Sequence, residues 1–165
     1  MDIEKLKAGD RILYSGIIYT ARDQAHLRLK EMLEKNIEIP IDFENSLIYY
    51  AGPTPTRPGT IIGSIGPTTS SRMDKFIEYM KPLGVYGMIG KGPRDSKVRN
   101  VIKRDGLIYF VATGGAGALL SKSVISAQEV LFEDLGCESI KRLEVKDFPL
   151  LVAIDSEGNS IFERN

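Results

Sequence analysis

Residues 85–112 read VYGMIGKGPRDSKVRNVIKRDGLIYFVA, and this stretch decides the fold class. Its two ends are short apolar runs rich in β-branched and aromatic residues, which is typical of buried strands. Between them, apolar residues recur at the spacing of one helix face, and Gly106 follows as a helix end signal. The predicted elements are a strand at 85–89, a helix at 95–104 and a strand at 107–112. Such alternation is typical of an α/β fold.

The alternation continues toward both ends of the chain. Thr20, three residues before Asp23, resembles a capping box and places the start of a helix there. A second helix is indicated by apolar residues at helical spacing, namely Met73, Phe76, Ile77 and Met80. Further predicted elements are strands at 11–18, 60–65, 140–145 and 150–154, and helices at 23–35, 71–81 and 118–124.

Residues 52–59, GPTPTRPG, predict a stiff loop, because proline fixes its own φ and biases the preceding residue toward extended geometry. Near the C-terminus, residues 155–159 predict a turn, and 160–163 the returning arm of a hairpin in a second small sheet. A chain of 165 residues has the size of one ordinary domain. We therefore expect a single domain over residues 1–165, with a mixed sheet.

Composition argues against several classes of function. Lys plus Arg and Asp plus Glu both number 22, so the formal net charge is zero, which argues against binding nucleic acid or anionic membranes through bulk charge. No apolar run approaches the ~20 residues of a transmembrane helix, and residues 1–10 lack the apolar core of a signal peptide. We expect a soluble, cytoplasmic protein. The only cysteine, Cys137, is interpreted as a packing residue, and one thiolate excludes an iron–sulfur cluster held by this chain alone.

Ligands of open α/β sheets bind beyond the carboxyl ends of the strands, where helices begin. Three predicted strand-to-helix junctions place a cation in or just past the loop, and these cations are Arg22, Arg72 and Lys91. Helix N-termini favour anions, and arginine recognises carboxylates through a planar pair of donors. The residues thus predict a small oxyanion site that suits a dicarboxylate or a phosphate ester. The four junctions are residues 19–26, 66–73, 89–93 and 112–117.

The same residues also have purely structural interpretations. A first-turn arginine such as Arg22 is commonly solvated, and hydroxyls at 68–71 suit a helix cap. The carboxylate of Asp23 suits a cap as well, and a lone histidine such as His26 is more often structural than catalytic. The glycines of the last junction match neither the dinucleotide-binding nor the phosphate-loop pattern.

Several motifs together resemble the iron–sulfur class of fumarases. The most specific are Arg-Asp-x-Ala-His at 22–26 and Thr-Thr-x-x-Arg-Met at 68–73, which follow each other in that order. The same domain forms the beta subunit of L-tartrate dehydratase and the C-terminal domain of single-chain class I fumarases. One departure is Ser70-Ser71, where family members often have Ala-Gly. The motifs are YTARDQAH (19–26), YAGP (50–53), GPTTSSRMD (66–74), GKG (90–92) and VKDFP (145–149).

This resemblance implies a swivelling β/β/α domain whose site is completed by a second chain. A [4Fe–4S] cluster would be held by cysteines of a cluster-bearing alpha subunit, in an expected α2β2 assembly. Thr68 would be the proposed catalytic base at the reacting carbon. The implied binding residues are Arg22, Arg72 and Lys91, which would hold the substrate carboxylates, with Asp23, His26 and Thr69 in supporting positions.

The implied reaction is the reversible addition of water to fumarate, giving L-malate. A threonine hydroxyl is a weak base near neutral pH, so Thr68 would need an activating group, expected from the partner subunit. Two alternatives stay open. In the first, the substrate is L-tartrate or mesaconate, since the choice among these dicarboxylates depends on pocket walls, many of them in the other chain. In the second, the chain is a free-standing anion-binding module.

Overall fold

The computed structural model describes residues 1–56, 58–113 and 117–163, with the backbone alone for Ala118 and Leu119. These residues form an α/β fold around one mixed six-stranded sheet with the order β1-β2-β3-β4-β6-β5. The strands are β1 (Arg11–Thr20), β2 (Ser46–Tyr49), β3 (Val85–Gly90), β4 (Ile108–Ala112), β5 (Val124–Leu131) and β6 (Ile140–Ile154). The α-helices are α1 (Asp23–Glu34), α2 (Met80–Leu83), α3 (Ser96–Asp105) and α4 (Gly117–Leu120). The 3-10 helices are η1 (Ile3–Lys5), η2 (Ser70–Tyr79), η3 (Ser121–Ser123) and η4 (Glu133–Glu138).

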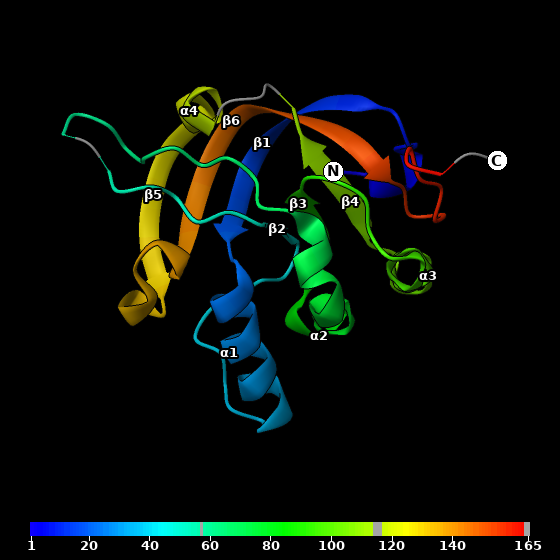
Figure 1. The fold of residues 1–165 in the computed structure, drawn as a ribbon, viewed down its shortest axis with the longest axis horizontal. Coiled ribbons are helices and arrows are strands. Elements are labelled where there is room, and N and C mark those ends of the chain that lie inside the picture. Colours follow the sequence, from blue (N-terminus) through cyan, green and yellow to red (C-terminus); the bar gives the residue numbers. More distant parts are fainter. Residues whose placement is uncertain (57, 114–116, 164–165) are drawn as a thin grey trace.

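The last long strand, β6, closes the sheet. Strands β1, β2, β3 and β4 run parallel to one another. β6 pairs antiparallel with β4 at one end of this row and with β1 at the other, so these strands form a closed, barrel-like sheet. Strand β5 pairs with the first part of β6, outside that ring. Figure 1 shows β6 running alongside β1, with β5 on its outer side.

Both faces of the sheet are buried, and each faces its own core. Inside the closed sheet, apolar side chains from its strands meet, including Leu47, Phe110 and Leu143. On the outer face, α1, η2 and α3 cover the sheet with a second core, to which they contribute Leu29 and Met73 among others. Neighbouring residues of the parallel strands alternate between the two cores, so these strands read in the sequence as continuous apolar runs.

The α/β class and the mixed sheet are confirmed. The confirmed elements are strands 11–18 (β1), 85–89 (β3) and 107–112 (β4), helices 23–35 (α1) and 95–104 (α3), and the short helical segment around 118–124 (α4 and η3). The turn at 155–159 is also confirmed, because Asp155 Oδ1 accepts the N–H groups of Glu157 and Asn159, each at 3.0 Å. Among the described residues, no helix has the length and apolar character needed to cross a membrane.

The predicted strand at 60–65 is wrong, because prolines line the segment that faces it. No strand is assigned there. Thr54 instead donates its N–H to the carbonyl of Ser64 at 3.0 Å, and its hydroxyl accepts the N–H of Ser64 at 2.8 Å. Pro53 and Pro55 have no N–H to offer a ladder, so the two segments pack as an irregular loop.

The strands predicted at 140–145 and 150–154 are one strand, β6. Asp147 adopts a φ of 52° inside it. The register with β1 shifts between Tyr14 and Gly16, on the opposite strand. This irregularity absorbs the turn-like residues that separated the two predicted strands.

The hairpin arm at 160–163 and the second sheet are wrong for the described residues. Ser160 forms an isolated bridge with Ile154 and no further ladder. β5, by contrast, was not predicted at all. Its residues 125–129 are all exposed, so no alternation of burial marks it.

The helix predicted at 71–81 begins as a 3-10 helix. η2 covers Ser70–Tyr79, and only the following turn, α2, is α-helical. In 3-10 geometry side chains three residues apart line up, and Ser70, Met73 and Phe76 are all buried. The apolar residues fit both periods, so the sequence pattern predicts the helix without its type.

The closed core can be tested on two leucines of paired strands. Leu143 is fully buried on β6, whereas Leu13 on β1 is 66% exposed. We expect Leu143→Ala to lower the free energy of unfolding by about 2–5 kcal/mol, through lost burial and the cavity left behind. Leu13→Ala, the matched control, should change it by less than about 0.5 kcal/mol. Urea denaturation measures both, and equal losses would contradict the closed core.

Candidate functional site

Loops that follow three parallel strands meet at one edge of the sheet. Arg22 follows β1, Gly52 follows β2 and Lys91 directly follows β3. These strands are neighbours in that order, so their carboxyl ends lie along one edge, about 4.8 Å apart from strand to strand. This edge, called the carboxyl edge below, is where the junctions predict a ligand. In Figure 1, α1 begins at this end of β1.

Residues 68–72 are held against the carboxyl edge by the backbone. The N–H of Thr68 donates to the carbonyl of Tyr50 at 2.7 Å, just beyond β2. Thr69 forms an isolated bridge with Lys91, and the N–H of Ser70 donates to the Lys91 carbonyl at 3.0 Å. Thr68 therefore lies between the ends of β2 and β3. Its half-buried hydroxyl makes no hydrogen bond to another described residue.

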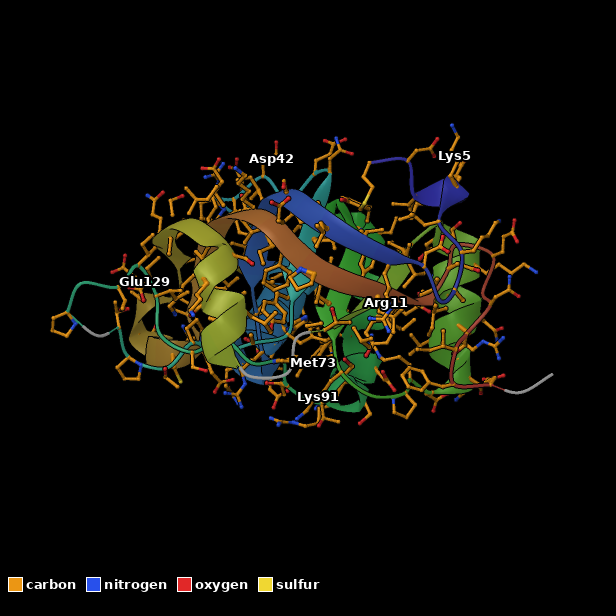
Figure 2. The ribbon with its side chains drawn as sticks, turned by 90° about the horizontal axis from the view of Figure 1, so that it is seen from above. Lys5, Arg11, Asp42, Met73, Lys91 and Glu129 are labelled. Atoms are coloured by element: carbon orange, nitrogen blue, oxygen red, sulfur yellow. The ribbon has the colours of Figure 1, made fainter. Side chains whose placement is uncertain are left out.

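Arg72 and Lys91 present their charges in different ways. Arg72 is exposed and forms an ion pair with Asp23 in the first turn of α1. Lys91 is also exposed and makes no ion pair within the described part of the chain. Figure 2 shows it at the margin of the molecule. The Arg72–Asp23 pair joins η2 to α1, while Lys91 is open to an incoming anion.

Arg22 is half-buried and lies against the turn after β2. A Cβ atom on Gly52 would stand 2.8 Å from Arg22 Cδ and 3.0 Å from its Nη1. A residue with a side chain at this position would therefore displace the guanidinium. Among the described residues, the buried Nε of Arg22 has no hydrogen-bond partner.

His26 is buried in an aromatic setting. Its ring centroid lies 5.3 Å from that of Phe76 and 5.5 Å from that of Tyr50. Nδ1 is 2.8 Å from the carbonyl oxygen of Arg22. Because a carbonyl can only accept, Nδ1 carries the proton and Nε2 is an acceptor. The ring thus braces the backbone of Arg22, which suits a supporting position.

The hydroxyls of Thr20 and Thr69 make none of the helix-cap hydrogen bonds that the sequence predicts. The capping box at Thr20 is wrong, since Arg22 is the N-cap of α1 without a side-chain cap bond. The Thr20 hydroxyl instead accepts the N–H of Lys141 at 3.2 Å. Thr69 is the N-cap of η2 and likewise makes no side-chain cap bond.

Arg94, Asp74 and Tyr109 lie beneath the carboxyl edge, and the sequence did not single them out. The Arg94 side chain has no exposed surface and forms an ion pair with Asp74. Its guanidinium carbon lies 5.2 Å from the ring centroid of Tyr50 and 4.9 Å from that of Tyr109. Charged residues are mostly exposed, so their residue types gave no reason to expect them in a buried site. The signal in the sequence was their position next to two motifs. Asp74 follows the Arg-Met motif, and Arg94 follows Gly-Lys-Gly by two residues.

Buried polar atoms without partners gather at this edge. In the described part of the chain these side-chain atoms are Arg22 Nε, Asp23 Oδ1, His26 Nε2, and Nη1 and Nη2 of Arg94. Leaving a buried polar atom unpaired is unfavourable, and such atoms in native proteins normally find a partner. These atoms therefore leave hydrogen-bonding capacity that the described residues do not use.

A family model supplies the decisive comparison. The model described as fumarase C-terminus matches residues 1–165. The chain belongs to the fumarase C-terminus family. The matched range includes the motifs that carried the resemblance, and those at 19–26, 66–74 and 90–92 lie at the carboxyl edge.

Relatives in this family differ in how much of them the chain spans. A protein provisionally named L(+)-tartrate dehydratase subunit beta, from Methanocaldococcus jannaschii, is 44% identical over 98% of this chain and 86% of that protein. Fumarate hydratase 2 of Leishmania major is 35% identical over 98% of this chain and 29% of that protein. The aerobic class I fumarate hydratase of Escherichia coli is 36% identical over 93% of this chain and 28% of that protein. The chain thus spans most of the first relative and less than a third of these two fumarate hydratases.

A hollow of about 360 Å³ lies elsewhere on the described surface and touches the motif at 50–53 through Pro53. Its walls come from the loop at 53–62 and from β5, Cys137 and Lys141, and it contains none of the three residues Thr68, Arg72 and Lys91. Cys137 is exposed, so its predicted packing role is wrong.

His26 is the only histidine, so its protonation can be followed directly. Burial, aided by the charge of Arg94, lowers its pKa from 6.5 to about 4. The folded ring stays neutral where the unfolded chain binds a proton, so this contribution to stability is full above about pH 6.5 and is lost as pH falls toward 4, by roughly 3 kcal/mol. Proton NMR of the untagged chain measures the folded pKa.

The matched control for this pH dependence is His26→Gln. Urea titrations at about pH 7 and about pH 4.5 should show a smaller difference in stability for the variant than for the wild type. A His26 midpoint near its ordinary value, or identical pH dependence of the two proteins, would contradict the buried neutral ring.

Proposed function

We propose that this chain is the beta subunit of an iron–sulfur-dependent hydro-lyase, a fumarate hydratase that adds water reversibly to fumarate to give L-malate. One observation carries the proposal. The carboxyl edge gathers Arg22, Lys91 and the Thr68–Arg72 segment, next to buried polar atoms that lack partners among the described residues. Cations beside a hydroxyl suit a small dicarboxylate. Family membership and the names of the fumarate hydratase relatives support the same reaction.

In this proposal the cations grip the two carboxylates. Lys91 makes no ion pair among the described residues and offers a compact charge to one end of the substrate. Arg72 starts from its pair with Asp23, and its planar fork has enough donors to hold Asp23 and a substrate carboxylate together. Arg22, which is half-buried against Gly52, adds charge from the β1 side. These groups would stabilise the negative charge that develops on the substrate in the transition state.

Thr68 is the proposed base. In malate dehydration it would remove the proton on C3, and in the reverse direction return it, while water adds to C2. Its hydroxyl is not engaged by another described residue, which leaves it available for this role. A hydroxyl is a weak base at neutral pH, so an activating group would come from the partner subunit. Asp23, His26 and Thr69 would support the site rather than touch the substrate.

The [4Fe–4S] cluster is proposed for the partner. This chain has one cysteine, and its described residues contain no group of three or more His, Cys, Asp or Glu able to hold a metal ion. That donor set does not fit a cluster held by thiolates. The roles proposed above for this chain are therefore carboxylate binding and proton transfer by its own side chains. The name "subunit beta" of the Methanocaldococcus relative supports a separate alpha chain. We further propose an α2β2 assembly in the cytoplasm and a single swivelling domain over residues 1–165.

A second candidate substrate has its own support. The relative that is 44% identical carries the name of an L(+)-tartrate dehydratase, and the chain spans 86% of it. Mesaconate is a third substrate of the same chemical kind. These dicarboxylates differ by hydroxyl or methyl groups, which pocket walls distinguish. The alternative outside this class, a free-standing anion-binding module, would hold its ligand without a partner.

Anaerobic co-expression with a candidate cluster-bearing subunit tests the proposal. We expect fumarate to be consumed only when both chains are present and the cluster is reconstituted, as followed by ultraviolet absorbance. L-Tartrate and mesaconate, assayed in parallel, identify the preferred substrate. A well-formed complex with an intact cluster that acts on none of them would contradict the hydro-lyase. Calorimetric binding of a dicarboxylate by this chain alone would then favour the binding module.

Thr68→Ala tests the proposed base in the assembled enzyme. Loss of a positioned general base should lower kcat by about a hundred-fold or more, with a much smaller change in KM because the cations that bind substrate are retained. Thr68→Ser, the matched control, keeps the hydroxyl and should retain most of the rate. Unchanged turnover in Thr68→Ala would remove this residue from the mechanism.

A further inference from the structure

A buried polar network joins the two segments that carry the proposed substrate-binding groups. The threonine segment, residues 68–74, contains Thr68 and Arg72. The lysine segment, residues 91–95, contains Lys91. Both segments run along the surface of the carboxyl edge, where Arg72 and Lys91 are exposed. Their spacing must therefore be held from beneath, by residues that the proposed reaction does not use.

The carboxylate of Asp74 ties the two segments together. Its Oδ1 pairs with Nε of Arg94, and its Oδ2 accepts the N–H of Asp95 at 3.0 Å. Both oxygens of a threonine-segment carboxylate are thus held by the lysine segment. Removing either charge would leave the other buried and unpaired, which is strongly unfavourable.

The guanidinium of Arg94 in turn anchors this tie to the sheet. It lies 5.2 Å from the ring centroid of Tyr50, just beyond β2, and 4.9 Å from that of Tyr109, on β4. The backbone carbonyl of Tyr50 also accepts a hydrogen bond from the N–H of Thr68. A planar cation stacks on aromatic faces in a way that a lysine ammonium does not reproduce.

A chain of hydroxyls makes a second tie. Ser70 Oγ accepts the N–H of Lys91 at 3.0 Å, and the Tyr109 oxygen lies 2.7 Å from Ser70 Oγ and 2.8 Å from the Gly92 carbonyl. Because a carbonyl can only accept, the Tyr109 hydrogen goes to Gly92, and the Ser70 hydroxyl donates to Tyr109. A Cβ on Gly90 would stand 1.9 Å from Ser70 Oγ, so this closeness depends on glycine.

We infer that Arg94, acting through Asp74 and supported by Tyr109, is a positioning residue that sets the distance between Lys91 and the Thr68–Arg72 segment. This spacing fixes the length of dianion that the two segments grip together. The inference rests on the proposed function for its effect on substrate. The network itself is a property of the fold and can be measured without turnover.

Arg94→Lys in the assembled enzyme is the main test. We expect KM for the preferred dicarboxylate to rise about ten-fold, since small misplacements of binding groups are costly, with kcat changed by less than about two-fold. A merely structural defect would lower the folded fraction, and so reduce the apparent kcat at unchanged KM. A reduced kcat at unchanged KM, in Arg94→Lys that is shown to be folded, would overturn the inference.

The matched control is Arg99→Lys. Arg99 lies on α3, donates from Nε to the Gly158 carbonyl at 2.9 Å and pairs with Glu163, away from both segments. It should leave KM and kcat at wild-type values. An equal rise of KM in both variants would overturn a specific role for Arg94.

Tyr109→Phe keeps the inference testable where Arg94→Lys fails to fold. It removes one hydroxyl and retains the ring beside Arg94, so it should raise KM by about three-fold, in line with the loss of one hydrogen bond. Tyr14→Phe is its control, because the Tyr14 hydroxyl donates to the Ile17 carbonyl at 2.9 Å, elsewhere in the fold. A wild-type KM in Tyr109→Phe would overturn the supporting role of Tyr109.

Amide hydrogen exchange of the full chain separates failure of the network from failure of the proposed function. The N–H groups of Ser70 and Lys91, which bond across the two segments, should exchange faster in Arg94→Lys and in Tyr109→Phe than in wild type. Unchanged exchange would overturn the network whatever the activity. Faster exchange in the two variants, together with a wild-type assembly that turns over no dicarboxylate, would keep the network and reject the proposed function instead.

Discussion

The closure of the sheet by β6 is the constraint on which the rest of the structure depends. This strand of 15 residues pairs with β1, β4 and β5. It ties the first parallel strand to the last, so the ends of β1, β2 and β3 cannot spread, and the loops that leave them stay together. The core inside the ring, with Leu143 and Phe148 from β6 itself, makes this closure favourable.

The carboxyl edge is organised in two levels. Arg72 and Lys91 lie at the surface, where a charge is well solvated and a ligand can reach it. Arg94 and Asp74 lie below, where a charge is tolerated because it is paired and packed between aromatic rings. In the proposed function the upper level would attract the substrate and the lower level would set the geometry of the binding groups. This division would let a chain of zero formal net charge present the proposed anion site.

The site was predictable where two independent signals coincided. At Arg22 and Lys91 an apolar run ends just before a helical pattern begins, so the junction and its cation could both be assigned. β5 gave no such signal, because it has one neighbouring strand and residues 125–129 are exposed. Arg94 and Asp74 escaped because they are 20 residues apart and meet only once η2 has packed on the sheet. Patterns of burial can be read locally, whereas partnerships between charges need the fold.

β5 has a further consequence for how copies of the chain behave in solution. Among the described strands it is the one with a single neighbour, and an unpaired strand edge can template sheet growth between molecules. Its exposed residues are mainly polar, with Ser126, Gln128 and Glu129 beside the apolar Ile125. The charge of Glu129 on this strand disfavours the dry stacking that fibrils need. Among the described strands, closure of the sheet therefore confines this risk to β5, whose exposed residues include the charged Glu129.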